Sequence, residues 1–290
     1  MLTEKSAELE RYQNIKNFAV LFSGGLDSTA VALLIGPRAQ GTAHLLTYFH
    51  HYGTFFNDWC RKHIPELRQV VGENKVFHQL FDIHAFFDEI AISTLIKDFF
   101  KYRDHFNICL GCQQAMATRT IIYCLEHNIT NAFICSSVGG EYAAMSMPLT
   151  RDRNTAFYQR YGIRYDAPLL RHNIAKPEER SLLASHNIHP GYGFRRSVQG
   201  YQPVCVLGFQ HGMDILFDLH TTYQPRRVDA FLDEKYQIME KIIERWFEQK
   251  GTPLAPLLEA NRLQYQLEQD ALDRWEQSFR QGTADSHQVS

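Results

Sequence analysis

The chain lacks both features that would direct it into a membrane or through one. None of its apolar stretches reaches the roughly 18 residues that a membrane-spanning helix requires. The polar N-terminus, MLTEKSAELERYQNIK, has neither the apolar core nor the cleavage-like site of a signal peptide. Of the 290 residues, 44% are hydrophobic and 21% are charged, which is ordinary for a globular protein. We therefore expect a soluble, cytoplasmic protein.

A strong excess of charge of one sign is also missing. The net charge of −2 excludes a molecule that is basic all over, as many nucleic-acid-binding proteins are. One stretch is locally basic, because Arg151, Arg153, Arg160, Arg164 and Arg171 follow one another at short intervals. This stretch is compatible with an ordinary solvated surface and equally with a site for RNA or phosphate.

The common metal motifs are absent as well. The 14 histidines form no HxxxH or HExxH pattern, and no dense C-x₂-C-x₂-C cluster is present. Six cysteines without a secretory signal favour reduced thiols, metal ligands or redox chemistry over a disulfide framework. Cys124 and Cys135 have the apolar surroundings of small core residues, whereas Cys60 is ambiguous.

The most informative segment that is present is NFAVLFSGGLDST, residues 17–29. A short β-branched and aromatic run ends in SGGLDS, and the helix-forming run AVALLI follows. Two glycines at this point let backbone N–H groups converge at the positive end of the next helix, which predicts a cradle for an anion. No lysine follows the glycines and no third glycine is present, so neither the GxxxxGK[ST] loop nor the GxGxxG fingerprint fits.

This segment resembles the PP-loop family, the N-type ATP pyrophosphatases, whose SGGxDS signature it matches at every fixed position. The resemblance implies ATP and Mg²⁺ as cofactors, with the loop holding the β and γ phosphates while a substrate carbonyl oxygen attacks the α phosphate. Asp27 would help to hold Mg²⁺, and a later loop containing Gly139 and Gly140 would lie beside the nucleotide. The implied nucleotide-binding residues are Ser23, Gly24, Gly25, Asp27, Ser28, Thr29, Gly139 and Gly140.

Alternation of short apolar runs with helical patterns predicts an α/β fold, a doubly wound parallel sheet with a C-terminal helical extension. The expected strands are Phe18 to Phe22, His44 to His50, Val76 to Phe81 and Ala132 to Ser136. The expected helices are Asp27 to Ile35, Trp59 to Val71, Ala85 to Phe100, Gln113 to Asn128 and Glu178 to His186. Ligands are then expected at the carboxyl ends of the strands. We expect an ATP-binding catalytic domain over 1–225, a helical extension over 226–282 and a disordered tail over 283–290.

Three cysteines form a second candidate site. Cys109 and Cys112 make a CxxC just before an apolar-periodic helix, where a helix N-terminus would lower the pKa values of both thiols. With Cys205 they resemble the sulfur-inserting branch of the PP-loop family, including the tRNA 2-thiocytidine enzymes. That resemblance implies a [4Fe–4S] cluster on Cys109, Cys112 and Cys205, or a persulfide on Cys109 or Cys112. Cys109, Cys112 and Asp27 are thus the implied catalytic residues. A zinc site completed by His211 or His220 is the structural alternative.

These parts predict a sulfurtransferase that adenylates a nucleobase carbonyl and replaces its oxygen by sulfur, releasing AMP and pyrophosphate. The acceptor is open between a tRNA base and a free base, as in a family relative that makes 6-thioguanine. The loop SVGGEY stands where tRNA-thiolating relatives usually read GHHxDD. A sulfur donor such as a cysteine desulfurase is the implied partner, and a homodimer stays open. Two alternatives are a 7-cyano-7-deazaguanine synthase-like ligase with structural zinc and a non-catalytic nucleotide sensor or partner subunit.

Two further sites are weaker. Lys176 precedes a helix start that has proline in its first turn, so it is either part of a capped helix or a contact to substrate or phosphate. Arg195 and Arg196 lie near Cys205 in sequence and are equally consistent with a substrate clamp and with an ordinary surface.

Overall fold

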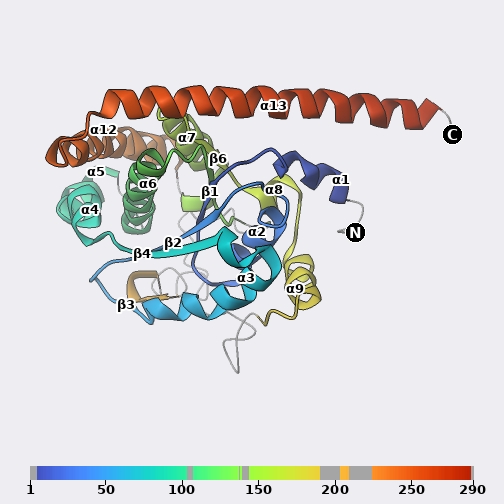
Figure 1. Ribbon diagram of the computed structural model, residues 1–290. Helices are drawn as coiled ribbons and strands as arrows, with labels where there is room; N and C mark the ends of the chain where they lie inside the picture. Colours follow the sequence, from blue (N-terminus) through green and yellow to red (C-terminus); the bar gives the residue numbers. More distant parts are fainter. Residues whose placement is uncertain are drawn as a thin grey trace.

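The fold is described from a computed structural model that covers residues 5–102, 107–136, 138, 144–189, 203–208 and 224–288. Within these residues a parallel sheet of five strands forms the centre, in the order β4-β2-β1-β5-β6 (Figure 1). Its strands are β1 (Phe18–Leu21), β2 (Ala43–Phe49), β4 (Val76–Asp82), β5 (Asn131–Phe133) and β6 (Arg164–Asp166). The predicted α/β fold with a parallel sheet is confirmed.

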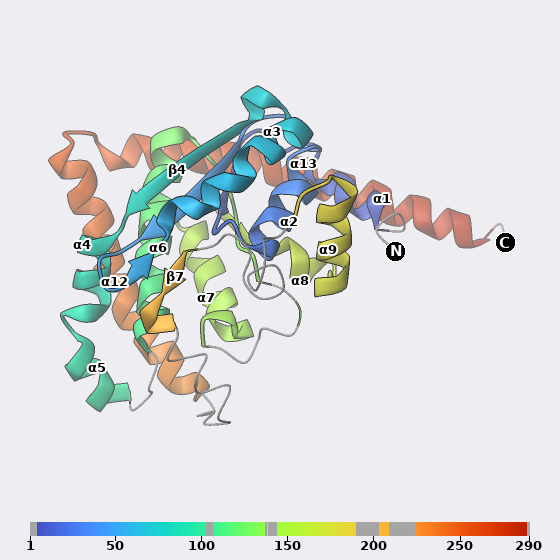
Figure 2. The same ribbon diagram turned by 90° about the horizontal axis from the view of Figure 1, so that it is seen from below.

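Helices cover both faces of the sheet because successive strand residues point to opposite sides. On β1, Phe18 and Val20 pack into one buried cluster, whereas Ala19 packs into the other. The first cluster takes in helices α2 (Leu26–Ile35), α3 (Ile64–Val71) and α9 (Lys176–Ser185). The second takes in α6 (Asn107–His127), α7 (Pro148–Gln159) and α12 (Pro225–Gln249), which lie together on the other side in Figure 2.

The last helix, α13 (Leu254–Gln288), runs along one side of the molecule (Figure 1). Asn261 anchors it, because its side-chain amide donates to the carbonyl oxygens of Ile129, Tyr161 and Gly162 at 3.3, 3.1 and 3.2 Å. Glu268 accepts hydrogen bonds from the side chains that start β5. The predicted boundary at residue 225 falls at the start of α12, and the division into domains stays a prediction.

Several elements depart from the sequence expectations in their bounds. The helix expected over Ala85 to Phe100 is three pieces, α4 (His84–Phe87), a π-helical turn η4 (Asp88–Ile92) and α5 (Leu95–Tyr102). Helix α6 begins at Asn107, so the CxxC lies inside it rather than before it. Strand β6 and helices α7 and α8 (Pro168–Arg171) were not expected from the pattern, since two of the three are only three or four residues long.

The remaining described elements are short. A two-stranded antiparallel sheet joins β3 (Thr54–Phe55) to β7 (Val204–Cys205), with Thr54 opposite Cys205. The other elements are α1 (Ser6–Leu9), η1 (Glu10–Tyr12), η2 (Asn57–His63), η3 (Glu73–Lys75) and η5 (Ala144–Ser146). Across the described ranges, no helix combines the length and the apolar character needed to cross a membrane.

Candidate active site

The SGGLDS segment forms a tight turn between β1 and α2. Gly24 has a φ of 74°, a left-handed conformation that glycine adopts without steric cost, and Gly25 is extended and caps the helix. The hydroxyls of Ser28 and Thr29 donate to the carbonyl oxygen of Gly25 at 3.2 and 2.8 Å. The backbone N–H of Ser23 donates to the Ser28 hydroxyl at 3.3 Å. The turn is therefore held by its own polar groups at the positive end of α2.

Charged side chains from α9 meet this turn. Lys176 forms an ion pair with Asp27, and its ammonium lies 3.5 Å from a carboxylate oxygen of Glu179. Lys176 and Glu179 are three residues apart on a helix, so both point toward the loop. Glu179 is 0% exposed, and burial first, with Asp27 next, raises its pKa to about 8. Two carboxyl groups and one ammonium are thus gathered beside the loop.

This arrangement fits ATP with a magnesium ion on an observation independent of the motif. Both carboxylate oxygens of Glu179 are buried without a hydrogen-bond partner among the described residues, which is costly unless a cation or proton satisfies them. Mg²⁺ is usually held by one or two carboxylates plus substrate phosphates. Asp27 and Glu179 supply that donor set, and Lys176 supplies a positive charge for a phosphate.

Sequence reasoning missed Glu179 as a member of the site. It named Lys176 only as one of two options, and it did not connect the start of α9 with the loop after β1. Contacts between α2 and α9, which bring the two segments together, depend on the tertiary fold. The one available signal was the spacing of Lys176 and Glu179 on a single helix face.

The cysteine site is built from three separate segments. Cys109 and Cys112 lie in the first two turns of α6, and Cys205 comes from β7, which lies beside α6 in Figure 2. The three thiols are near enough that Cys205 raises the pKa values of both others, and Cys109 raises that of Cys112. Parts of the chain that are far apart in sequence therefore meet at this point.

The expectation that the helix N-terminus lowers the thiol pKa values is wrong. Burial is the largest influence on both residues, and it raises the pKa of Cys109 to about 11 and that of Cys112 further. Removing a thiolate from water outweighs the helix dipole when no cation lies beside the sulfur. At neutral pH these two groups are thiols until a metal or a sulfur atom binds them.

Cys205 differs from the other two cysteines because a histidine is bonded to it. His50 Nε2 lies 3.7 Å from Cys205 Sγ, and His50 Nδ1 accepts a hydrogen bond from the backbone N–H of Tyr52 at 3.1 Å. Burial, and then His84, lower the pKa of His50 to about 4, so it is neutral at pH 7. The ring proton is therefore on Nε2, and His50 donates to the sulfur.

The metal expectations fare differently from one another. Among the described residues, no group of three or more His, Cys, Asp and Glu side chains is arranged to hold a single metal ion. A zinc ion on Cys109, Cys112 and Cys205 does not fit this placement. His211 and His220 lie outside the described residues. A polynuclear cluster spaces its cysteine ligands more widely than one ion does, so three neighbouring thiols remain a suitable donor set for iron–sulfur.

The other predicted residues divide into two groups. Gly139, Gly140, Arg195 and Arg196 lie outside the described residues. The arginines of the basic stretch are engaged within the chain: Arg171 binds Asp166 through several hydrogen bonds of 2.8 to 3.1 Å, Arg164 binds Asn131 and Gln269, Arg160 binds Glu240, Arg153 binds Asp229 and Arg151 binds the Ser146 carbonyl. These contacts favour the interpretation of an ordinary surface.

No protein-family profile and no curated protein matches the chain. Two solved structures resemble it, each with 14% sequence identity, a TM-score of 0.41 and coverage of 82% of this chain. One is the U34-tRNA thiolase NcsA from Methanococcus maripaludis with its [4Fe–4S] cluster, covered over 80% of its length. The other is NMN synthetase from Francisella tularensis, covered over 95%. Both are PP-loop ATP pyrophosphatases, the class that the sequence resembles. At this level of similarity the likeness concerns the fold, and function has to be argued from the chain's own residues.

Proposed function

We propose that the chain is an ATP-dependent sulfurtransferase that adenylates a nucleobase carbonyl and replaces its oxygen by sulfur. The observation that supports this most directly is the placement of two sites at one edge of the sheet. The SGGLDS loop follows β1, and His50, which binds Cys205, follows the neighbouring strand β2. An activated carbonyl and a sulfur group would therefore meet at the carboxyl ends of adjacent strands.

The loop side carries out the first half of the reaction. Backbone N–H groups at the start of α2 and the Lys176 ammonium bind the β and γ phosphates, while Asp27 and Glu179 hold Mg²⁺. The carbonyl oxygen of the acceptor attacks the α phosphate, and pyrophosphate leaves. Adenylation is needed because an amide-like oxygen is a poor leaving group, whereas AMP is a good one.

The cysteine side supplies the sulfur in the second half. Cys109, Cys112 and Cys205 either hold a [4Fe–4S] cluster, which would offer an iron position for sulfide, or carry sulfur as a persulfide on one thiol. Sulfur attacks the activated carbon, and AMP is released with the original oxygen atom. The raised pKa values of Cys109 and Cys112 support a role that begins only when such a partner is bound.

The acceptor is a nucleobase, either free or in tRNA, and the sulfur comes from a donor such as a cysteine desulfurase in the cytoplasm. Two measurements test the proposal together. The first is the iron, acid-labile sulfide and zinc content after anaerobic purification of the wild type and of Cys112→Ala. The second is conversion of ATP to AMP and pyrophosphate with and without candidate bases and tRNA.

Iron and sulfide that are lost in Cys112→Ala support the cluster-dependent form, and absence of metal supports the persulfide form. Turnover of ATP that depends on an acceptor supports adenylation. Zinc alone would overturn the proposal in favour of the deazaguanine-type ligase. Binding of ATP without turnover in the presence of every acceptor would instead indicate a nucleotide sensor.

A further inference from the structure

A strained aromatic residue stands next to the cysteine site. Among the described residues, four that are not glycine have positive φ, namely Asn128, Asn173, Asn187 and Phe56. Asparagine tolerates the left-handed region, but a bulky ring does not, so Phe56 with φ of 59° stores strain of about 1–3 kcal/mol. Strain of this kind persists where the surrounding structure and a function hold it.

The strain presents an aromatic stack at the surface. The ring of Phe56 stacks on Trp59 with 4.3 Å between centroids and 25° between planes, and 50% of Phe56 is exposed. Phe55 is 52% exposed beside it. Trp59 covers one face of Phe56, and the half that is exposed leaves room for another flat ring. We call Phe55, Phe56 and Trp59 the aromatic platform.

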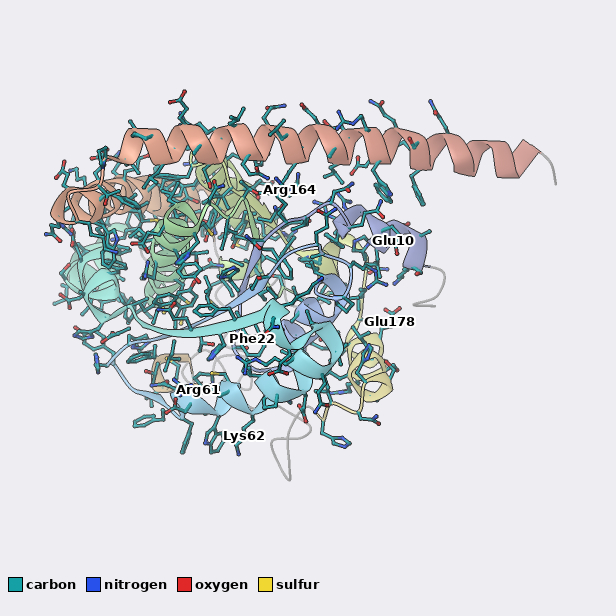
Figure 3. All side chains as sticks on the ribbon, in the orientation of Figure 1. Glu10, Phe22, Arg61, Lys62, Arg164 and Glu178 are labelled. Carbon is teal, nitrogen blue, oxygen red and sulfur yellow. The ribbon has the colours of Figure 1, made fainter. Side chains whose placement is uncertain are left out.

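Positive charge accompanies the aromatic platform. The ammonium of Lys62 lies 5.4 Å from the Trp59 ring, and Arg61 is exposed and paired with Asp58 at 3.3 Å. These three charges sum to one positive charge next to the rings. Arg61 and Lys62 lie on the side of the molecule away from α13, at its outer edge (Figure 3). A base that stacks here would thus have a cation within reach of its phosphate.

The platform is tied to the sulfur site through the β3–β7 sheet. Thr54 is the register partner of Cys205 and Phe55 that of Val204, so the platform begins one residue after the partner of Cys205. Cα atoms of antiparallel partners lie about 4.5–5.5 Å apart. A ligand on the platform would therefore be held close to the cysteine that His50 bonds.

We propose that the aromatic platform binds an unpaired base of a single-stranded nucleic acid, with Lys62 close to the backbone phosphate. This rests on the proposed function and names nucleic acid rather than a free base as the form in which the acceptor arrives. A free nucleotide generally needs a concave site that buries most of its surface. An exposed stack with a cation suits a chain that is also held elsewhere along its length.

The test measures binding of a fluorescein-labelled octa-adenylate RNA by anisotropy. The nucleotide loop is kept saturated with Mg²⁺ and α,β-methylene-ATP, which cannot be cleaved at the α phosphate. Phe56→Asn removes the ring and relieves the strain, so its melting temperature should not fall below that of the wild type. We expect this variant to bind the RNA about 5- to 150-fold more weakly, as loss of one base stack predicts.

Two matched variants complete the design. Phe77→Asn removes another half-exposed ring at the opposite end of the sheet, near the start of β4, and should bind normally. Lys62→Gln should reduce the slope of log affinity against log salt by about 0.7, the loss of one phosphate contact. Normal binding by Phe56→Asn would overturn the inference, as would equal weakening by Phe77→Asn or equal affinity for AMP and RNA. Pyrophosphate exchange is measured separately, so failure here leaves the proposed ATP chemistry intact, and the reverse also holds.

Discussion

The loop side and the cysteine side of the candidate site are prepared in different ways. At the loop, Asp27, Lys176 and Glu179 are already charged or share a proton, and they are held by ion pairs. At the cysteines, two thiols are buried and their pKa values are raised. The loop side is thus electrostatically ready for a phosphate and a cation. The cysteine side becomes ionised only when something binds to it.

This difference teaches which side should respond to which change. Removal of a charge at the loop should affect adenylation and leave the thiols untouched. Removal of a cysteine should abolish sulfur transfer and leave adenylation intact. Two substitutions, one on each side, can therefore separate the halves of the reaction.

The largest effect is expected from Cys112→Ala. Loss of a sulfur-carrying or cluster-holding residue should lower the rate of thiolation more than about 1000-fold, as removal of a covalent catalyst does. Pyrophosphate exchange, which reports adenylation alone, should stay within about threefold of the wild type. Cys124→Ala is the matched control, because Cys124 is a fully buried core residue on the same helix. Equal loss of thiolation in the two variants, or loss of exchange in Cys112→Ala, would contradict the separation.

The reciprocal change is Asp27→Asn. It removes a carboxylate that pairs with Lys176 and would hold Mg²⁺, so pyrophosphate exchange should fall by about 100-fold or more. The metal content and the number of titratable thiols should equal those of the wild type. Asp58→Asn, at an exposed position away from the loop, serves as the control. An Asp27→Asn enzyme that exchanges pyrophosphate normally would remove the loop from the mechanism.

The same contrast explains what sequence could predict. The loop residues are contiguous, and the chemistry of two glycines before a helix is local, so the turn and the parallel sheet follow from the pattern. Glu179 could not be found in this way, because its approach to Asp27 depends on how α9 packs against α2. Burial is set by the whole fold.

The cysteines show the same limit more sharply. The spacing of Cys109 and Cys112 indicated that they act together with Cys205, and the three do lie close to one another. The sign of their pKa shift was predicted wrongly, because a helix start is visible in sequence whereas the depth of burial is not. The bond from His50 to Cys205 joins residues 155 positions apart and left no local signal.

A smaller effect tests the electrostatics of the loop side. The pKa of Glu179 is about 8 in the folded chain, raised by burial and by Asp27, against a usual value near 4.5. Between these values the folded state keeps a proton that the unfolded state has lost, so stability falls as pH rises toward 8. From pH 6.5 to 8.5, the wild type should lose about 1–2 kcal/mol of unfolding free energy relative to Glu179→Gln.

Urea unfolding at several pH values measures this difference. Glu178→Gln is the control, because the pKa of Glu178 is lowered, chiefly by a backbone hydrogen bond at Ala175, and the group stays ionised throughout this range. Parallel stability curves for the wild type and Glu179→Gln would show that Glu179 does not keep its proton.

The smallest effect concerns the one polar contact that sets Cys205 apart. His50 donates from Nε2 to the sulfur because Tyr52 occupies Nδ1. A donor stabilises a developing thiolate by about 1 kcal/mol, so His50→Phe should slow alkylation of Cys205 by iodoacetamide about fivefold. His50→Gln keeps an N–H donor and should recover most of the rate, which a purely structural role for the ring would not predict. Peptide mass spectrometry follows each cysteine separately, and Cys109 and Cys112 should react slowly in all three proteins because burial keeps them protonated. If Cys205 reacted equally fast with phenylalanine at position 50, the two sides of the site would differ by burial alone.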